Sequence, residues 1–354
     1  MKVKKLSLKN FRNISSLTIE PCDGMNVICG ENAQGKTNLL EAIWLFTGAK
    51  SFRTSKDIYF VKNGEEKADC NLEFFSEGIN KEASLVIKEK RTAFLNGNKL
   101  KSASNLAGSF NAIVFSPNDL SLVADGPSVR RKFLNLALGQ LYPNYIEILR
   151  KYTRAVTQRN QLIKEYRYDS TVGIMLDVFE DEIAENGKKL ILYRKKYIEK
   201  LNEFLPKVYS GISCGKEELE TRYICKTKED ELKDALFDSR KDDMYSGTTS
   251  VGPHRDDIEF KINGFEARQY GSQGQKRSVA LSLKLAEAEV IKENVGECPV
   301  FLLDDIMSEL DPNRQNFILN HIEGMQTFLT CCDPDNVKNL KAGKVFNINE
   351  GRII

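Results

Sequence analysis

The sequence lacks several features that mark whole classes of protein. Its 354 residues hold 52 lysines and arginines against 50 aspartates and glutamates, so the formal net charge is only +2. A chain without a large excess of one sign has no global affinity for polyanions, so any nucleic-acid contact must come from a local cluster of cations. No apolar run approaches the roughly 20 residues that a membrane-spanning helix needs.

The eight cysteines show no C-x-x-C spacing, which argues against a zinc site or a disulfide framework. Several sit in apolar runs, where a thiol behaves as a small hydrophobic group. No signal peptide is recognisable, because residues 1–6 lead into an alternating strand pattern rather than an apolar core. We therefore expect a cytoplasmic protein in a reducing compartment.

What the chain does contain is a phosphate-binding loop of the form G-x-x-x-x-G-K-[ST]. A short apolar strand, residues 25–29, precedes it, and residues 38–46 follow with helical apolar spacing. Because glycines let backbone N–H groups converge on an anion at a helix N-terminus, this context predicts nucleotide binding. The predicted contacts are Gly30, Glu31, Asn32, Ala33, Gln34, Gly35, Lys36 and Thr37.

Within the loop, two side chains have predicted roles of their own. Lys36 is expected to reach the β- and γ-phosphates and to assist catalysis, and the Thr37 hydroxyl to hold Mg²⁺. The alternative reading is an ordinary glycine turn ahead of a helix.

The rest of the chain predicts a discontinuous α/β domain interrupted by helices. Strands are expected over 2–9, 17–19, 69–75, 83–88, 92–95, 111–115, 258–262, 265–268, 299–303 and 327–329, and long helices from 127 and over 273–294. We expect an ATPase domain formed by 1–135 plus 250–354, and an inserted helical domain over 136–249.

Two heptad-like runs in the insert predict an antiparallel helical hairpin. The first includes Tyr145, Tyr152 and Arg159, and the second runs from Leu176 to Phe204 in steps of seven. With a turn near residues 168–170, each arm is on the order of 40–50 Å long at 1.5 Å per residue. An ordinary pair of core helices is the alternative.

The apolar strand 300–303 ends in two carboxylates, the Walker B arrangement. Asp304 is expected beside the phosphate loop, where it holds Mg²⁺, and Asp305 is expected to orient or deprotonate the attacking water. Many buried strands end in an acidic residue, so the strand alone is weak evidence. The phosphate loop in the same chain is what makes the Walker B assignment specific.

Just before the long helix, Ser272, Gly274 and Gln275 offer a second anion site at a helix N-terminus. Alone they read as a serine cap and a glycine turn. In order, however, the phosphate loop, Ser-x-Gly-Gln, the Asp-Asp strand and residues 308–311 resemble the head of ABC-type ATPases. That resemblance implies an α/β head with a mixed sheet, and implies that Ser272 contacts the γ-phosphate of ATP held by a second copy.

The motifs also resemble the RecF family of SMC-like, ABC-type ATPases from end to end. The matching stretches are 8–13, 30–37, 50–53, 114–117, 126–131, 252–257, 270–275 and 303–311. The resemblance implies an ATP-dependent homodimer that binds duplex DNA and junctions at gaps, works with RecR and RecO, promotes loading of RecA and supports the SOS response. It also adds Arg12 to the nucleotide-binding residues and implies slow, DNA-stimulated ATP hydrolysis that serves as a switch.

DNA contacts are expected from local cation clusters, which neutralise phosphates without reading sequence. For any one of these residues a solvated helix charge is an equally good explanation. The candidates are Lys50, Arg53, Arg130, Arg131, Lys132, Lys188, Lys189, Arg194, Lys195 and Lys196.

Three other functions fit the sequence less well. A transporter subunit is expected to carry a histidine where Cys331 stands. A structural, chromosome-associated SMC-type ATPase needs arms far longer than this insert supplies. A small-molecule kinase leaves Ser272–Gln275 and the hairpin without a role.

Overall fold

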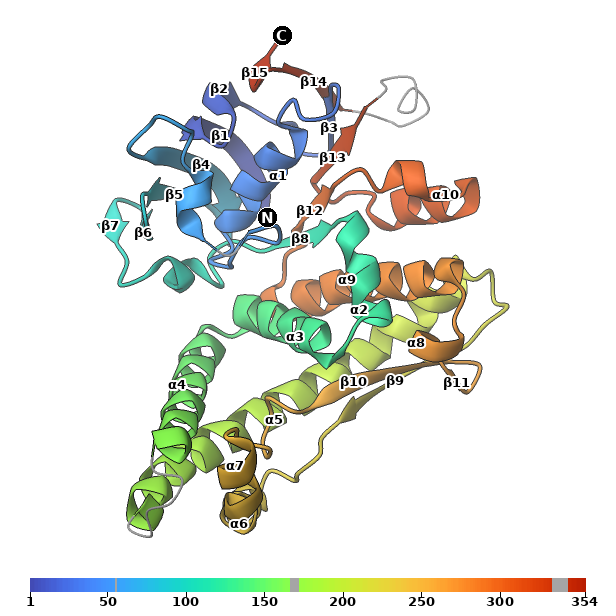
Figure 1. The fold of residues 1–354 in the computed structure, drawn as a ribbon. Helices are drawn as coiled ribbons and strands as arrows, with labels where there is room; N and C mark the ends of the chain where they lie inside the picture. The colour runs from blue at the N-terminus through green and yellow to red at the C-terminus, as the bar shows by residue number, and fades with distance from the viewer. Residues whose placement is uncertain (55, 166–171, 333–342) are drawn as a thin grey trace. The chain divides into compact units, whose positions relative to one another are not determined.

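The computed structural model describes residues 1–54, 56–165, 172–332 and 343–354, which form two compact units (Figure 1). The first unit holds 1–120, 207–216 and 277–354, and the second holds 121–206 and 217–276. Two of the boundaries fall inside the long helices α5 (Val172–Ile212) and α9 (Gln273–Val295). The domain division at residues 135 and 250 stays a prediction.

The centre of the first unit is a sheet of parallel strands. Its order is β15-β14-β3-β13-β12-β8, and only β15 runs antiparallel to its neighbour. Strands β3, β13, β12 and β8 are almost wholly buried and apolar, as strands covered on both faces must be. The bounds are Met25–Cys29 (β3), Ala112–Phe115 (β8), Val300–Leu303 (β12), Thr327–Cys331 (β13), Lys344–Asn349 (β14) and Arg352–Ile353 (β15).

A second sheet in the same unit is antiparallel, with the order β2-β1-β4-β5-β6-β7. Its strands alternate buried and exposed residues, because one face meets the core and the other meets solvent. Helix α1 (Lys36–Leu45) contacts β1 of this sheet and β13 and β8 of the parallel sheet. The strands are Lys2–Phe11 (β1), Ile14–Ile19 (β2), Ala68–Ser76 (β4), Ile79–Ile87 (β5), Arg91–Leu95 (β6) and Asn98–Lys99 (β7).

The second unit contains the predicted helical hairpin. Helix α4 (Pro143–Glu165) runs antiparallel to α5, since Tyr145 contacts Arg194 at one end and Arg159 contacts Glu180 nearer the other. The arms differ in length: at 1.5 Å per residue, 23 residues give α4 about 35 Å and 41 residues give α5 about 60 Å. Helix α5 is longer than predicted because it continues through Pro206. The predicted turn at 168–170 lies outside the described residues.

Arg159 is the most unusual side chain of the hairpin, because its guanidinium is fully buried. It donates to Glu180 at 3.0 Å, to Asp243 at 2.7 Å and to Thr249 at 2.9 Å. A buried charge is tolerated only when it is paired and hydrogen-bonded. These contacts join α4, α5 and α7 (Arg240–Ser246) within one polar core.

The remaining elements complete the two units. In the second, β9 (Leu219–Ile224), β10 (Asp257–Ile262) and β11 (Phe265–Glu266) form an antiparallel sheet. The strand predicted over 265–268 ends at Glu266, because Ala267–Tyr270 turns into the short helix α8. The other helices are Ser121–Ala124 (α2), Pro127–Leu141 (α3), Leu232–Asp238 (α6) and Pro312–His321 (α10), with 3₁₀ turns at Asp57–Phe60, Ala103–Leu106, Pro117–Leu120 and Met307–Glu309.

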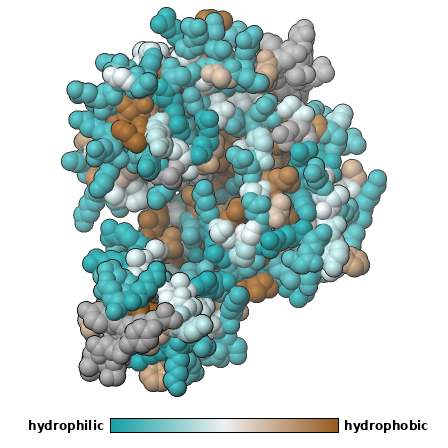
Figure 2. Space-filling view, viewed as in Figure 1, coloured by the Kyte–Doolittle hydropathy of each residue, from teal (hydrophilic) through white to brown (hydrophobic). Residues whose placement is uncertain are grey.

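Hydrophilic residues cover most of the face drawn in Figure 2, with smaller brown patches between them. Among the residues that the structure describes, no helix combines the length and apolar character required to cross a bilayer.

Candidate nucleotide-binding site

The predicted phosphate loop connects β3 to α1 at the carboxyl edge of the parallel sheet. Gly30 has a φ of 157°, and a Cβ built there falls 2.3 Å from the carbonyl oxygen of Ile348. Gly35 has a φ of 112°, in the left-handed region that favours glycine, and it caps α1. The backbone geometry therefore requires glycine at both positions of the motif.

The amino group of Lys36 forms hydrogen bonds with the backbone of the phosphate loop itself. It donates to the carbonyl oxygens of Gly30 at 2.5 Å and Glu31 at 3.0 Å. The side chain is buried, with 7% of its surface exposed. The ammonium also lies 3.3 Å from the Cys332 sulfur. A buried ammonium held by these neutral acceptors is well suited to exchange them for anionic phosphate oxygens, which form stronger charge-assisted hydrogen bonds.

Thr37 and Asp304 lie together, as predicted, although 267 residues separate them. The Thr37 hydroxyl donates to the Asp304 carboxylate at 2.8 Å, and the Thr330 hydroxyl donates to the same oxygen at 3.1 Å. This set of carboxylate and hydroxyl oxygens beside a phosphate loop suits Mg²⁺, which prefers oxygen ligands. Thr330 was not singled out from the sequence, yet its place at the end of β13 brings it to this edge.

The two aspartates at the end of β12 are in different environments. Asp304 is 9% exposed, and this burial raises the pKa of its carboxyl group, an effect opposed by hydrogen bonds from Thr37 and Thr330. Asp305 has a φ of 51° and is less buried; its N–H donates to Thr330 at 2.8 Å, and its carboxylate accepts from Ser308 at 3.3 Å. The roles of these residues in catalysis stay predictions.

The middle of the loop is held by neighbouring segments. The Gln34 carbonyl accepts from Gly351 at 3.0 Å, and its side-chain oxygen accepts from Glu350 at 2.6 Å. Ala33 has a φ of 65° and, like Glu31 and Asn32, it is exposed. These contacts hold the loop in a curled form while leaving three of its residues open to solvent.

A charged cluster beside the loop was only partly anticipated. Glu41 of α1 is fully buried, and Arg12 contacts its carboxylate through two nitrogens at 3.0 Å each. Ser51 donates to the same carboxylate, and Arg53 lies 3.8 Å from it. Arg12 also stacks over Phe60, with 5.0 Å from its guanidinium carbon to the ring centre. Glu41 could have been noticed as an acid within the apolar run 39–46.

Ser272 forms the amino-terminal cap of α9 in the second unit. Its hydroxyl accepts from the Gln275 N–H at 3.2 Å, while the Gln275 side chain accepts from the Ser272 N–H at 2.8 Å. This reciprocal pair is a capping box, and it leaves the exposed hydroxyl at the start of a 23-residue helix. The Gln275 amide nitrogen is also occupied, by Glu217 at 2.8 Å.

The chain is similar to known proteins over nearly its whole length. The RecF/RecN/SMC N-terminal domain family matches residues 2–351. The DNA replication and repair protein RecF of Clostridium acetobutylicum is 41% identical over 362 residues, covering 100% of this chain and 99% of the relative. The chain belongs to the RecF family.

Solved structures agree with that membership in the RecF family. The recombination mediator protein RecF with ATP, in the RecFOR pathway, matches with a TM-score of 0.93 at 37% identity, covering 100% of this chain and 97% of that one. The Smc head domain of Pyrococcus furiosus, solved with an extended coiled coil and the C-terminal domain of ScpA, matches with a TM-score of 0.57 at 17% identity and covers 100% and 96%. The latter shows the fold alone. The prediction of an ABC-type ATPase head is confirmed.

The cations proposed for DNA are divided between the two units. Lys50 and Arg53 belong to the first unit, where Lys50 is exposed and Arg53 also donates to Asn38 at 2.7 Å. In the second unit, Lys132 is exposed and Arg131 donates to the carbonyl oxygen of Asp256 at 2.9 Å. Lys188 and Lys189 are exposed and pair with Asp230 at 2.5 Å and Glu185 at 2.7 Å.

Two of the DNA predictions are wrong. Arg130 is 3% exposed, and its guanidinium is bound to Asp257 at 2.6 and 2.9 Å. Arg194 is 2% exposed and donates to the carbonyl oxygen of Pro253 at 2.6 Å. Neither guanidinium can meet a phosphate, because each is enclosed and used to hold the second unit together.

His254 also has a structural role in the second unit. Its ring lies 2.5 Å from the Tyr152 hydroxyl and 3.0 Å from the carbonyl oxygen of Thr249. Burial lowers the pKa of His254 to about 4, so the ring is neutral at physiological pH.

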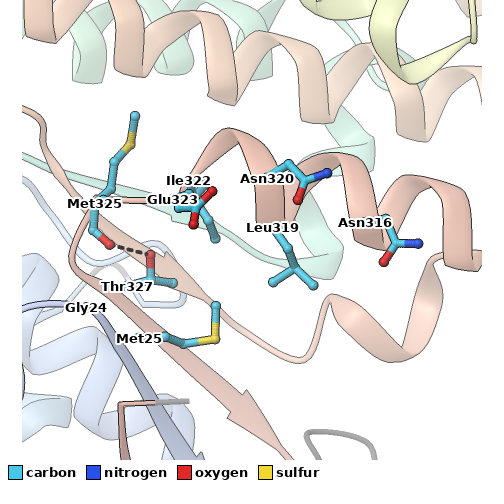
Figure 3. A pocket seen from close by; sticks show the side chains of 10 residues that line it. Gly24, Met25, Asn316, Leu319, Asn320, Ile322, Glu323, Met325 and Thr327 are labelled. Carbon is cyan, nitrogen blue, oxygen red and sulfur yellow. Dashed lines mark hydrogen bonds between the residues drawn. The ribbon is translucent and has the colours of Figure 1, made fainter. Parts of the chain in front are cut away.

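A pocket of about 370 Å³ lies at the opposite edge of the parallel sheet (Figure 3). It is lined by Met25 and Thr327, where β3 and β13 begin, and by Asn316 and Asn320 of α10. Phosphate binding needs the converging N–H groups and Lys36 found at the carboxyl edge. The pocket is therefore separate from the nucleotide site.

Proposed function

We propose that this protein is an ATP-gated DNA-binding protein of recombinational repair and replication. ATP binds at the phosphate loop, with its β- and γ-phosphates on Lys36 and on the N–H groups at the start of α1. The observation that carries this proposal is the contact of Thr37 with Asp304 beside the closed loop. The ATP of the related RecF structure supports the same ligand.

A second copy of the chain completes the binding site around the nucleotide. Ser272 and Gly274 of one copy contact the γ-phosphate held by the other, and Gln275 keeps the turn in shape through its bond to the Ser272 N–H. Two ATP molecules then join two copies. Because the γ-phosphate is the contact that differs between ATP and ADP, hydrolysis releases the dimer.

Hydrolysis is slow and serves as a switch, without chemistry on DNA. The hydroxyl oxygen of Thr37 and the carboxylate oxygens of Asp304 are suitable ligands for Mg²⁺. When bound there, Mg²⁺ would neutralise negative charge on the phosphate oxygens. Asp305, held by Thr330 and Ser308, orients the attacking water. Arg12 and Arg53, anchored on Glu41, add positive charge at the side of the loop.

The dimer binds duplex DNA and junctions at gaps, in the cytoplasm. Lys50, Arg53, Arg131 and Lys132 are the cations whose positions allow phosphate contacts, with Lys188 and Lys189 available after exchange of their surface ion pairs. Through RecR and RecO the protein promotes loading of RecA on single strands, and so supports the SOS response. Membership of the RecF family and the pathway of its solved relative support these partners.

Sedimentation and duplex binding, each measured with ATP, with ADP and without nucleotide, test the proposal. We expect dimers and tight DNA binding with ATP alone, and weaker binding at higher salt, because phosphate contacts release counterions. A chain that stays monomeric with a non-hydrolysable ATP analogue and duplex contradicts the dimer. Equal DNA affinity in all three states contradicts the switch.

A further inference from the structure

Three thiols lie at the carboxyl edge of the parallel sheet, around the phosphate loop. Cys29 ends β3 and Cys331 ends β13, and the two residues are register partners in neighbouring strands. Their sulfur atoms are 3.0 Å apart, and both side chains are buried, with exposed fractions of 1% and 8%. The adjacent Cys332 is exposed; its sulfur lies 3.3 Å from the Lys36 amino group.

The backbone already brings the buried pair within reach of a bond. Neighbouring strands lie about 4.8 Å apart, and disulfides join residues whose Cα atoms are about 4.4–6.8 Å apart. Facing positions on paired strands also direct both side chains to the same face of the sheet. Both residues are free cysteines here, as a reducing compartment maintains them.

We propose that Cys29 and Cys331 form a peroxide-sensitive modification site whose disulfide weakens ATP binding. The effect on ATP rests on the proposed function, whereas the disulfide does not. Hydrogen peroxide is the oxidant. One thiol sulfur attacks a peroxide oxygen, the O–O bond breaks, and a sulfenic acid and water form. The second thiol sulfur then displaces the hydroxyl group, the S–S bond forms, and a second water leaves. Two thiols lose two electrons and two protons, and one peroxide becomes two waters.

Cys331 is the thiol that peroxide reaches first, because it is the more exposed of the pair. Even so, only 8% of the Cys331 surface is exposed, so peroxide reaches the sulfur slowly. The site therefore responds to sustained peroxide rather than to brief exposure, and a thiol reductant reverses it.

The cross-link acts on ATP because both cysteines adjoin the machinery of the site. Cys29 precedes Gly30, whose carbonyl oxygen holds Lys36. Cys331 follows Thr330, whose hydroxyl holds Asp304. The sulfur atoms must approach from 3.0 Å to about 2.05 Å. Because Cys29 is bonded directly to Gly30, and Cys331 directly to Thr330, a movement of either cysteine backbone on cross-linking also moves the groups that hold Lys36 and Asp304.

The test uses the full chain, first reduced and then treated with hydrogen peroxide. After free thiols are alkylated, digestion without reductant and mass spectrometry locate the cross-link, and titration with a fluorescent ATP analogue measures affinity. We expect a peptide joining Cys29 to Cys331, an affinity about tenfold lower, about 1.4 kcal/mol, and recovery of affinity with dithiothreitol.

Variants assign the effect to the pair. Cys29→Ala and Cys331→Ala should each remove the cross-link and the peroxide-dependent fall in affinity. Cys332→Ser, whatever its own affinity for ATP, and Cys214→Ser, at an exposed cysteine far away in the sequence, should retain both the cross-link and the peroxide-dependent fall in affinity. The proposal is overturned if Cys29 and Cys331 remain thiols while Cys332 and Cys214 are oxidised, or if the disulfide forms with ATP affinity unchanged. Failure of the reduced protein to bind ATP overturns the proposed function instead, because the cross-link is measured independently.

Discussion

Two helices begin at predicted anion sites, and their first turns are built differently. At the start of α1, in the first unit, the chain supplies a curled loop, a buried Lys36 and the pair Thr37 and Asp304. At the start of α9, Ser272 has a capping partner in Gln275, and its hydroxyl remains exposed. The first site carries the charge that a triphosphate needs. The second offers a hydroxyl and a helix dipole, which suffice only for a phosphate already held elsewhere.

The largest expected effect is that of Lys36→Ala on the first helix start. Removing the ammonium deletes two charge-assisted hydrogen bonds to phosphate, so ATP affinity should fall by roughly 100-fold or more. The dimer and the DNA binding that depend on ATP should be lost with it. Equilibrium titration with a fluorescent ATP analogue measures the change, and an unaltered melting temperature without nucleotide shows that the fold is intact. Retained affinity would show that Lys36 is not the phosphate ligand.

Asp304→Asn should separate hydrolysis from stability at the same site. Loss of the carboxylate that suits Mg²⁺ should lower the hydrolysis rate by about 100-fold, measured as phosphate release. Because burial raises the folded-state pKa of Asp304, the folded state binds its proton more tightly, and stability falls as pH rises from the unfolded to the folded pKa.

The neutral variant should therefore be more stable than the parent protein at pH 7 without nucleotide, and that advantage should disappear below the unfolded pKa. Melting temperatures of both proteins at pH 3.5 and pH 7 test this. A less stable variant at pH 7 would mean that the hydrogen bonds from Thr37 and Thr330 outweigh the desolvation of the charge.

These two predictions rest on residues that the sequence assigns to one edge of the sheet, where Thr37 contacts Asp304 and Lys36 binds the carbonyl oxygen of Gly30. Asp304 directly follows the buried strand β12, and Lys36 follows the loop after the buried strand β3. The carboxyl ends of parallel strands lie at the same edge of a sheet, so the two residues are expected near each other. Arg130 shows where sequence reasoning fails, because it is buried whereas Lys132, two residues further on, is exposed. Successive residues of a helix point in directions about 100° apart, so a run of cations always turns some of them inward. Which ones are buried depends on a partner such as Asp257, which lies 127 residues away.

Ser272→Ala should leave ATP binding at the start of α1 unchanged and remove the phosphate contact at the start of α9. ATP affinity of the isolated chain should stay within about twofold, whereas ATP-dependent dimerisation should weaken at least about tenfold, because each site loses one hydrogen bond to a charged phosphate. Sedimentation velocity over a range of protein concentrations measures the dimer. Undiminished dimerisation would show that the hydroxyl serves only as the cap of α9. Its removal would then lower the free energy of unfolding by about 1 kcal/mol and have no other effect.

The smallest expected effect is that of Gln275→Ala, which removes half of the capping box and keeps the Ser272 hydroxyl. We expect a loss of about 1 kcal/mol in unfolding free energy, with the ATP-dependent dimer retained. Asn105→Ala is the matched control, since Asn105 accepts from the Ser102 N–H at 3.0 Å in another capping box. Denaturant unfolding should give similar losses for both variants. If Gln275→Ala instead abolished dimerisation while Asn105→Ala did not, Gln275 would itself be a contact to the second copy, and the division of labour between Ser272 and Gln275 would be wrong.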